Sequence, residues 1–576
     1  MILIFGGTTE GRLAVDVCEK AGNTYYYSTK GSIQDVAMHN GVRLTGVMTA
    51  ADMKSFCKEH DVRCIVDAAH PFAETLHKAI ADAGQPVVRL LRSFGPRIEG
   101  VTYCSDYADA VERMSQTNIH CLLALSGANT ISRLSGYWQH HRTLFRILNR
   151  AESIETALRS QFPTGNLIFY NDDCRLPSIE DEKALMQSVG CDAIITKESG
   201  ASGGYDAKVQ AALQLGLQVY VIEAPQPHPD AIVVTGRHGL RRAIEHLVPH
   251  FFPLHTGFTT GACATAATKA ACLSLMYDEV PEEVAFTLPD DEVMTIPVAI
   301  EGRGVASVVK DSSDDPDVTK GCRITSTVRW NDCDEIRFLQ GEGVGTVTLP
   351  GLGIEVGEPA INPTPRSMMK RELRSLTPRG VDVTISVAGG ETLAKHTFNP
   401  KVGVVGGISI IGTSGIVSPL SHEAFVQSIR REMEVAKAIG CREIALVSGK
   451  RSEDYLLSKR EVRCIHYGNA IGEALLAAHQ LSIPEVTVGI MLGKAVKLAE
   501  GHLDTHSHRV TMNRDFLKSI APDCSELIDS ITLARELWQF MPPDFFDTIR
   551  HLCYQHCRTV YPDGKLTIEL ICDDKL

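Results

Sequence analysis

The sequence lacks three features: a membrane-spanning hydrophobic run, a repetitive or low-complexity segment, and an excess of basic residues. No hydrophobic run approaches the roughly 20 residues of a membrane-spanning helix, and there is no long internal repeat or low-complexity tract. Basic residues are not in excess, since 57 Lys and Arg stand against 70 Asp and Glu, for a formal net charge of −13. Such a chain is a poor general binder of nucleic acid or of an anionic membrane. With 576 residues, 44% of them apolar, it is typical of a soluble protein of several domains.

The 17 cysteines show no framework of paired spacings. Their number is odd and they are scattered singly through apolar stretches, as is typical of buried or free thiols in an intracellular enzyme. The apolar run at Met1–Gly7 is too short to leave room for a signal peptide. We therefore expect a cytoplasmic location.

The first 250 residues or so alternate short β-rich runs with helical patterns, which predicts parallel βαβ units. Strands are expected at Ile2–Phe5, Thr24–Ser28, Cys64–Ala68, Val87–Leu91, Cys121–Leu125, Leu144–Leu148, Leu167–Tyr170, Ala193–Thr196 and Val219–Ile222. The alternation pauses near residues 95–118. We therefore predict an α/β domain over residues 1–250, built from two Rossmann-like lobes of about 1–100 and 118–250. One large doubly wound sheet is the alternative.

A different pattern begins after Pro249–Pro253, and we place a second domain at residues 254–576. A loop rich in glycine and threonine precedes an alanine-rich helix there. Either Thr259 or Thr260 can cap that helix, because a hydroxyl accepts a hydrogen bond from a free N–H of the first turn.

The rest of the second domain is predicted to be α+β and not βαβ. Residues 284–347 are mostly strand-like, and Val318–Trp330 and Asp334–Leu339 are expected to be neighbouring antiparallel strands. Residues 515–576 are predicted to be mainly helical.

A glycine-rich loop follows the first predicted strand. Glycines let a backbone approach a phosphate closely, and the helix N-terminus after them adds free N–H groups. The residues that offer this are Gly6, Gly7, Thr8, Thr9 and Glu10. The second strand ends at Ser28-Thr29 without the acidic residue that usually binds a ribose 2′-hydroxyl, so both NADH and NADPH stay open. The alternative is a tight strand–helix turn that binds nothing.

Two more polar loops follow predicted strands, where ligands usually bind in open α/β sheets. Asp67–Ala73 contains His70, and its simpler interpretation is a helix start led by proline. Thr196–Lys208 is rich in glycine and hydroxyls and contains Lys197. It could bind anions, or it could be only a flexible connection.

Residues 1 to about 250 resemble the precorrin-6A/cobalt-precorrin-6A reductase family of cobalamin biosynthesis. The matching segments are Gly6–Arg12, Asp67–Ala73, Arg89–Arg92 and Ile195–Gly200. The resemblance implies a two-lobed Rossmann-like fold and hydride transfer from NADH or NADPH to a tetrapyrrole. The nucleotide would then bind at Gly6, Gly7, Thr8, Thr9, Glu10, Ser28 and Thr29. The substrate would contact Arg89, Arg92, Ser199 and Gly200, with His70 and Lys197 as candidate proton donors.

Three clusters in the second domain contain residue types that bind metals. They are Asp311, Asp314, Asp315 and Asp317; His502, His506 and His508; and His551, Cys553, His556 and Cys557. The aspartates lack the EF-hand spacing, and an Asp-rich turn that caps its own backbone is the alternative we favour. We favour a polar pocket edge without metal for the first histidine cluster and packed or solvated side chains for the second. We predict no protein metal site.

Residues from about 254 to the C-terminus resemble the cobalt-precorrin-5B (C1)-methyltransferase family. The matching segments are Thr256–Lys269, Lys310–Thr319, Gly341–Arg366, Asn399–Pro419 and Gly493–Ser507. The resemblance implies methylation of a ring carbon of a cobalt tetrapyrrole by S-adenosylmethionine, on an α+β fold unlike that of Rossmann methyltransferases. We expect the methyl donor at Thr259, Thr260, Gly261, Asp311, Asp314, Asp315, Gly343, Gly345, Gly407, Ser409 and Thr413.

Two resemblances to adjacent steps of one pathway predict a bifunctional enzyme. It would methylate cobalt-precorrin-5B at C1 to cobalt-precorrin-6A and then reduce that product to cobalt-precorrin-6B. The macrocycle carries many carboxylates, so Arg366, Lys370 and Arg371 are expected to contact it; ordinary surface charges are the alternative. Other enzymes of the pathway and a second copy of the chain stay open as partners. The rival interpretation is a nicotinamide-dependent reductase with a corrinoid-binding second half that does not catalyse.

Overall fold

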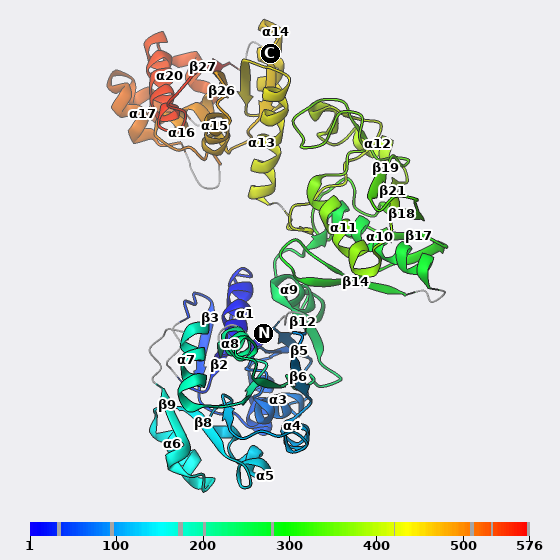
Figure 1. The fold of residues 1–576 in the computed structure, drawn as a ribbon. Helices are drawn as coiled ribbons and strands as arrows, with labels where there is room; N and C mark the ends of the chain where they lie inside the picture. Colours follow the sequence, from blue (N-terminus) through cyan, green and yellow to red (C-terminus); the bar gives the residue numbers. More distant parts are fainter. Residues whose placement is uncertain are drawn as a thin grey trace. The chain divides into compact units, whose positions relative to one another are not determined.

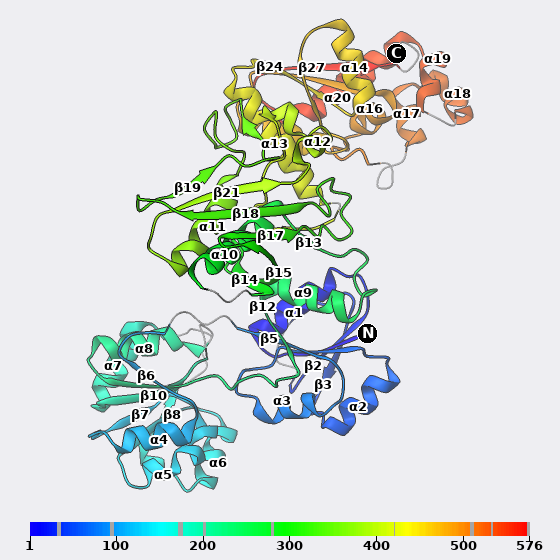
Figure 2. The same ribbon diagram turned by 90° about the vertical axis from the view of Figure 1, so that its right-hand side faces the viewer.

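The computed structural model describes residues 1–31, 36–92, 97–170, 177–199, 203–277, 281–419, 421–506, 512–531 and 534–572. The chain divides into two compact units, Met1–Pro253 and Leu254–Leu576 (Figure 1 and Figure 2). Among the helices described, none combines the length and the hydrophobicity needed to cross a bilayer.

The first unit contains a six-stranded parallel sheet in the order β12-β5-β4-β1-β2-β3. Its strands are β1 Ile2–Phe5, β2 Tyr25–Thr29, β3 Gly41–Thr45, β4 Cys64–Asp67, β5 Val87–Leu91 and β12 Ile232–Thr235. Helices α1 Thr9–Glu19 and α9 Gly236–Leu247 pack on one face, and α2 Ala50–Glu59 and α3 Glu74–Ala81 on the other. Successive residues of β1 alternate between these two faces and all four are buried, which explains its uninterrupted hydrophobic sequence.

A second six-stranded parallel sheet has the order β6-β11-β10-β7-β8-β9. Its strands are β6 Val101–Cys104, β7 Leu122–Ala124, β8 Thr143–Leu148, β9 Leu167–Tyr170, β10 Ala193–Lys197 and β11 Gln218–Ile222. One core contains residues of α4 Tyr107–Ser115, α5 Ser135–Trp138 and α6 Ala151–Arg159. The core on the other face contains residues of α7 Ile179–Val189 and α8 Tyr205–Gln214.

The predicted lobe boundaries of about 1–100 and 118–250 are wrong at both ends of the second lobe. Strand β6 begins at Val101 and belongs to the second sheet, whereas β12 pairs in parallel with β5 of the first. Helix α9, which follows β12, packs against the core of the first sheet. The chain therefore crosses between the two sheets twice. Both strands have four residues, too few for periodicity alone to assign them to a sheet.

The second unit begins with a mixed five-stranded sheet in the order β16-β17-β18-β21-β19. Its strands are β16 Ala299–Gly302, β17 Val305–Val309, β18 Arg323–Trp330, β19 Ile336–Leu339 and β21 Val381–Val387. Short pairs surround it: β13 Gly257–Phe258 with β23 Ile416–Val417, β14 Glu283–Thr287 with β15 Val293–Pro297, and β20 Thr346–Val347 with β22 Val404–Val405. A short helix, α12 Gly390–Ala394, follows β21.

The expected direct pairing of β18 with β19 is wrong. Strand β21 lies between them, antiparallel to β18 and parallel to β19. A strand from much later in the chain forms these hydrogen bonds, and short-range patterns carry no information about such pairing.

Helix α10 (Thr260–Met276) is buried on nearly all sides. It packs against β17, β18 and helix α11 (Pro363–Leu376). A helix enclosed in this way needs small side chains, which explains why its sequence is rich in alanine and threonine rather than amphipathic.

The remainder of the second unit contains a four-stranded sheet in the order β25-β24-β26-β27, and all its pairs are parallel. Its strands are β24 Glu443–Val447, β25 Arg463–His466, β26 Glu485–Met491 and β27 Lys565–Ile571. The larger helices here are α13 His422–Ala438, α14 Lys450–Lys459, α15 Ile471–Gln480, α16 Leu492–Ala499 and α20 Pro543–Arg558. Three short helices are α17 Arg514–Ile520, α18 Ser525–Ser530 and α19 Leu537–Phe540.

The mixed sheet agrees with the α+β prediction, but the exclusion of βαβ units from the second domain is wrong. Strands β24, β25 and β26 alternate with helices in parallel βαβ order. Within the stretch predicted to be mainly helical, β27 forms an edge strand whose residues alternate between exposed and buried. Helices flank these strands in the sequence, so the hydrophobic periodicity of the region is mainly helical.

Leucine in place of Ala267 tests the packing of α10. Ala267 is fully buried, so the Ala267→Leu variant is expected to lose about 1–3 kcal/mol of unfolding free energy through overpacking. The matched Ala438→Leu change lies at the exposed end of α13 and should stay within about 0.5 kcal/mol of the wild type. Urea unfolding measures both. Equal effects of the two variants would contradict the packing described for α10.

Candidate functional sites

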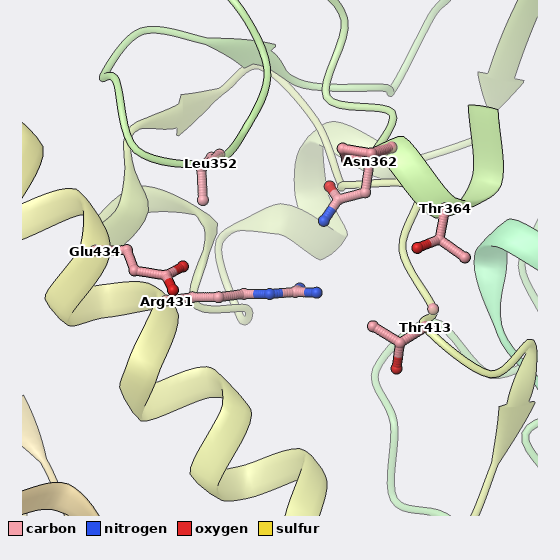
Figure 3. Close-up of a pocket in the computed structure, with 8 residues that line it drawn as sticks. Leu352, Asn362, Thr364, Thr413, Arg431 and Glu434 are labelled. Carbon is pink, nitrogen blue, oxygen red and sulfur yellow. The ribbon is translucent and has the colours of Figure 1, made fainter. Parts of the chain in front are cut away.

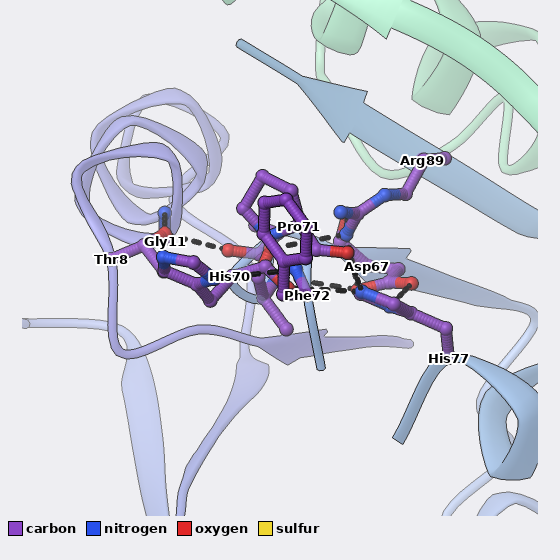
Figure 4. Close-up of polar contacts among 10 residues, drawn as sticks. Thr8, Gly11, Asp67, His70, Pro71, Phe72, His77 and Arg89 are labelled. Carbon is purple, nitrogen blue, oxygen red and sulfur yellow. Dashed lines mark hydrogen bonds and ion pairs between the residues drawn. The ribbon is translucent and has the colours of Figure 1, made fainter. Parts of the chain in front are cut away.

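The loop after β1 is tied to the loop after β4. The Thr8 hydroxyl caps helix α1 by accepting a hydrogen bond from the Gly11 N–H (3.0 Å), and it donates to the Ala68 carbonyl (2.7 Å) (Figure 4). Strands β1 and β4 are sheet neighbours, so the loops that leave their carboxyl ends meet at one edge. This edge is where open α/β sheets bind ligands.

Tyr27 lies beneath the glycine loop. A Cβ atom on Gly6 would lie 2.3 Å from the Tyr27 ring, and the N–H of Gly7, at φ +96°, donates to the Tyr27 hydroxyl (3.1 Å). Packing against Tyr27 therefore requires glycine at position 6, and the positive φ favours glycine at position 7. Gly7 and Thr9 are nevertheless exposed above, where a ligand could contact them.

The side chains expected at the end of β2 are not presented to a ligand. Ser28 and Thr29 are both buried. The Ser28 carbonyl accepts the N–H of Gly6 (3.0 Å), and the Thr29 hydroxyl donates to the Gly31 carbonyl (2.8 Å). Both residues position the loop instead.

Glu10 and Arg92 form a bidentate ion pair, with Nε–Oε1 and Nη2–Oε2 distances of 2.7 Å. Burial acts to raise the pKa of Glu10, but the hydrogen bonds and charge of Arg92, with hydrogen bonds from a backbone N–H and from Thr8, together outweigh it and hold the pKa below its usual range. Arg92 also donates to the Ser199 carbonyl, from the loop after β10. Arg92 is therefore paired with groups of the chain itself, and its role as a substrate contact stays a prediction. Gly200 lies outside the described residues.

Arg89 is buried at 5% exposure and donates to Asp67 Oδ1 (2.7 Å) and to the carbonyls of Asp67 and Ala69. The expected substrate contact at Arg89 is contradicted, because this guanidinium lies beneath the loop. Asp67 Oδ2 bonds His77 Nδ1 (2.7 Å), and His77 Nε2 lies 3.0 Å from the carbonyl of His70 (Figure 4). His77 was not predicted from the sequence, where its only signal is its place one helical turn into α3.

His70 and Lys197, the two candidate proton donors, lie near each other. Partial burial lowers the pKa of His70, and the positive charges of Lys197 and Arg92 lower it further. Burial also lowers the pKa of Lys197, assisted by the charge of Arg133. The Lys197 ammonium lies 5.3 Å from the centre of the Phe72 ring and forms no hydrogen bond or ion pair with any residue that the structure describes.

In the second unit, the loops expected to bind the methyl donor meet through their backbones. The N–H groups of Phe258, Thr259 and Gly261 donate to the carbonyls of Asp311, Gly415 and Ile411, respectively, at 2.8–3.0 Å. Their hydroxyls join the same junction. Thr259 caps α10 by accepting the Ala262 N–H (3.1 Å), Thr260 accepts the Ile411 N–H (2.8 Å), and Ser409 donates to Asn399 Oδ1 (3.1 Å).

Backbone contacts explain the glycines of the next two loops. A Cβ atom on Gly343 would lie 2.0 Å from the Val387 carbonyl oxygen, and one on Gly407 would lie 2.3 Å from the Gly343 oxygen. At Gly345 a Cβ atom would lie 2.4 Å from Val404 Cγ1. The space beside these glycines is filled by the chain itself, so their presence is explained without a ligand.

The aspartate cluster folds as an Asp-rich turn. Asp311 Oδ1 accepts the Ser313 N–H (2.8 Å), and Asp314 Oδ2 accepts the His255 N–H (2.7 Å). Asp317 pairs with the buried Lys310 (2.6 Å). Asp315 lies in the same turn, its N–H bonded to the Ser312 carbonyl. This is the arrangement of the alternative we favoured, in which carboxylates cap nearby backbone groups.

The cysteines of the second histidine cluster face the core of α20. Cys553 and Cys557 are fully buried, and burial raises the pKa of the Cys557 thiol to about 12. A thiol held protonated in this way is a poor metal ligand. His551 is exposed and bonds Gln555 (2.9 Å). In the first cluster, His502 Nε2 lies 3.6 Å from Glu500, and His508 is outside the described residues.

Two hollows lie at the start of α11. The first is a cavity of about 150 Å³ lined by Leu352, Asn362, Pro363, Thr364, Gly412, Thr413, Arg431 and Glu434 (Figure 3). The second is a groove of about 480 Å³ lined by Gly353, Ile354, Glu355, Glu358, Pro363, Arg366, Ser367 and Lys370. Both are lined by Pro363. Thr413 was predicted from the sequence. Asn362 and Arg431 were not, because neither lies in a glycine-rich loop or in a cluster of metal-binding residue types.

The three cations predicted on α11 have different surroundings. Arg366 and Lys370 lie about 40° apart around a helix and both line the groove. Arg371 lies about 140° from Arg366, where it pairs with Asp291 (2.8 Å) and donates to the Thr287 and Leu288 carbonyls. Its expected substrate contact stays a prediction, and the structure does not place it among the residues of the groove.

Arg366 is largely committed to its own loop. It donates to the carbonyls of Ile361 (2.8 Å) and Pro359 (3.1 Å) and lies 3.3 Å from a Glu358 oxygen. Lys370 is exposed, and its ammonium lies 6.0 Å from the centre of the Phe338 ring. Lys370 is thus the more available cation of the groove.

Two families match the chain. The model described as "Precorrin-6x reductase CbiJ/CobK" matches residues 1–244, and the model described as "CbiD" matches residues 249–419. A cobalt-precorrin-5B C(1)-methyltransferase from Prosthecochloris aestuarii is 41% identical over 345 residues, which cover 55% of this chain and 94% of that protein.

A protein of the same name from Geobacillus kaustophilus is 43% identical over 281 residues, which cover 46% of this chain and 76% of its own. The solved structure of a "CobK precorrin-6A reductase" is 21% identical and covers 43% of this chain and 97% of that one, with a TM-score of 0.35.

The Asp67 carboxylate supports the loop that carries His70, and removal of its charge tests that role. The Asp67→Asn variant leaves Arg89 buried without its counter-charge, and we expect a loss of about 3–5 kcal/mol in unfolding free energy. The additional change Arg89→Met should restore part of it. The exposed Asp82 at the end of α3 provides the control Asp82→Asn, expected within about 0.5 kcal/mol of the wild type. An Asp67→Asn variant as stable as this control in urea would contradict the assignment.

Proposed function

The chain belongs to the cobalt-precorrin-5B C(1)-methyltransferase family and matches the precorrin-6x reductase family over residues 1–244, and we propose that it catalyses two consecutive steps on one tetrapyrrole. The second unit methylates cobalt-precorrin-5B at C1, giving cobalt-precorrin-6A. The first unit then reduces that product to cobalt-precorrin-6B. The observation that carries this conclusion is the presence of both family matches, one after the other, on a single chain.

S-Adenosylmethionine is the proposed methyl donor of the second unit, and it supplies a methyl group on a sulfonium that transfers without a protein nucleophile. The chain's task is to position the reactants. The cavity fits a small polar part of the donor, since Asn362, Thr364 and Thr413 surround it with amide and hydroxyl groups (Figure 3). Thr259 and Thr260 hold the loops of this junction together, so we assign them a positioning role.

The groove beside this cavity is the proposed contact for one edge of the macrocycle. Lys370 is its available cation and would pair with a peripheral carboxylate of the substrate. Glu355 and Glu358 also line the groove. Because Arg366 lies beside Glu358, it offsets one of these negative charges and keeps the groove from repelling an anionic substrate.

A reduced nicotinamide dinucleotide is the proposed cofactor of the first unit, where it supplies the hydride. The exposed N-terminal turn of α1, with Gly7 and Thr9, fits a phosphate group, because its backbone N–H groups and helix dipole favour anions. Residues Ser28–Gly31 carry no carboxylate that would exclude a 2′-phosphate, so NADH and NADPH are both accommodated by this proposal.

His70 and Lys197 are the proposed sources of the proton. The Phe72 N–H points at His70 Nδ1 (3.3 Å), so in the neutral ring Nδ1 accepts and the proton resides on Nε2. Lys197 keeps its ammonium unpaired among the described residues. Its lowered pKa brings proton release closer to neutral pH, as general acid catalysis requires.

The cysteines agree with the proposed cytoplasmic location. Every cysteine that the structure describes is a free thiol. Free thiols persist in a reducing compartment. We also propose other enzymes of the same pathway and a second copy of the chain as partners.

Product masses test the two activities. The purified chain would be incubated without oxygen with cobalt-precorrin-5B and S-adenosylmethionine, with and without NADH or NADPH. We expect the gain of one methyl group without nicotinamide, and of one methyl group and two hydrogens with it. A methyl gain that never proceeds to reduction would contradict the reductase assignment. No mass change with verified substrate would contradict the whole proposal.

Substitution of Lys197 tests the proton source. If Lys197 donates the proton, Lys197→Met should lower the reduction rate by about 10²–10⁴-fold. The rate of the wild type should fall at alkaline pH with a midpoint below the ordinary lysine pKa, because burial lowers the pKa of Lys197. Methylation by the same preparation is the internal control. If the reduction rate of Lys197→Met still fell at alkaline pH as in the wild type, Lys197 would not be the proton donor. His70 would then be the remaining candidate, to be tested with His70→Asn.

A further inference from the structure

Arg431 brings an unpaired positive charge into the cavity at the start of α11. Its side chain extends from α13 toward Asn362 and Thr413 (Figure 3). Among the residues that the structure describes, none forms a hydrogen bond or ion pair with its guanidinium. A half-buried arginine that has given up part of its hydration without gaining a partner is an incomplete ion pair.

The neutral groups around Arg431 are also unused. Asn362 is the N-cap residue of α11, yet its side chain makes no capping hydrogen bond. The hydroxyls of Thr364 and Thr413 have no hydrogen-bond partner within the described part of the chain. An amide and two hydroxyls can donate to one anion at the same time, and the N–H of Thr364 can join them, whereas Pro363 and Pro365 on either side of it carry no N–H.

The one carboxylate that lines the cavity does not neutralise Arg431. Glu434 Oε1 instead lies 3.2 Å from Nε of Arg430, the preceding residue of α13. Arg430 also donates to Gln480 (2.6 Å), which directs it away from the cavity. Glu434 and Arg430 therefore offset each other, and the charge of Arg431 and the hydrogen-bond donors around it remain available to a ligand.

We propose that this cavity binds a carboxylate, with Arg431 as its counter-charge. Arginine matches a carboxylate with two parallel hydrogen bonds, and the lining threonines and Asn362 can complete its solvation. A volume of about 150 Å³ admits a carboxylate on a short chain but not a macrocycle. The inference rests on the proposed function, since both ligands of that reaction carry such a group: the amino-acid end of the methyl donor and the acid side chains of the tetrapyrrole.

Binding measurements on the full chain test this inference. The probes are S-adenosylhomocysteine, 5′-methylthioadenosine, which lacks the amino-acid carboxylate, and cobalt-precorrin-5B under anaerobic conditions. The variant Arg431→Gln is compared with Lys437→Gln, which removes an exposed cation from the same helix. We expect Arg431→Gln to weaken binding of one carboxylate ligand by roughly ten- to a hundredfold, and Lys437→Gln to leave it unchanged.

The pattern of losses identifies the ligand. Weaker binding of S-adenosylhomocysteine with unchanged 5′-methylthioadenosine assigns the cavity to the methyl donor, and weaker binding of cobalt-precorrin-5B alone assigns it to the substrate. Unchanged binding of all three probes by Arg431→Gln would overturn the inference and leave the proposed function intact. A wild type that binds neither carboxylate ligand would overturn both.

A conservative variant separates the ionic role from damage to the fold. Arg431→Lys keeps the charge but loses the two-pronged geometry, so its affinity should fall between those of the wild type and Arg431→Gln. Thermal unfolding should be unchanged in both variants, since Arg431 makes no hydrogen bond to the residues described. Equal weakening in both variants together with a lowered melting temperature would contradict the inference.

Discussion

The backbone of residues 343–345 runs directly against that of residues 407–408, with no side chain between them. Hydrogen bonds continue from this contact along the chain: Gly345 and Ile408 bond at 2.9 Å, Ala360 donates to Gly345 at 2.7 Å, and Asn362 donates to the Ile410 carbonyl at 3.0 Å. This ladder fixes where α11 begins. The Asn362 and Thr364 side of the cavity therefore depends on glycines that pack against other parts of the chain.

In the first unit, the buried carboxylate of Asp67 supports a loop of the candidate site. Asp67 leaves the end of β4 and binds Arg89 from one side and His77 from the other. Together they support the loop that carries His70, and Thr8 connects this loop to the turn after β1. Charge that would otherwise be available for an anionic substrate is used to build the loop. Among the described residues of this edge, Lys197 has no charged partner, whereas Arg89 and Arg92 have one.

In both units, some positive charges near the candidate sites bind other groups of the chain and others have no partner among the described residues. Arg89, Arg92, Arg366 and Arg371 all bond to the chain's own carbonyls or carboxylates. Lys197, Lys370 and Arg431 have no such partner among the described residues. Neither proposed reaction needs a protein nucleophile, since hydride and methyl both come from bound donors. Rigid loops with a few available charges suit chemistry of this kind, in which the protein positions the reactants.

Much of this protein is determined by local sequence. Short strands are evident from their mainly apolar residues: β1, β5 and β9 have the predicted bounds, although β9 ends with the exposed Phe169 and Tyr170. The Thr259 cap and the Asp-rich turn follow from chemistry within a few residues. Tertiary structure alone decided the rest. It inserted β21 between β18 and β19, returned β12 to the first sheet, and buried Arg89 beneath a loop while leaving Arg431 unpaired. The reason is that strand order and the pairing of a charge depend on groups that lie far apart in the sequence, and a residue type by itself does not specify which partner reaches it first.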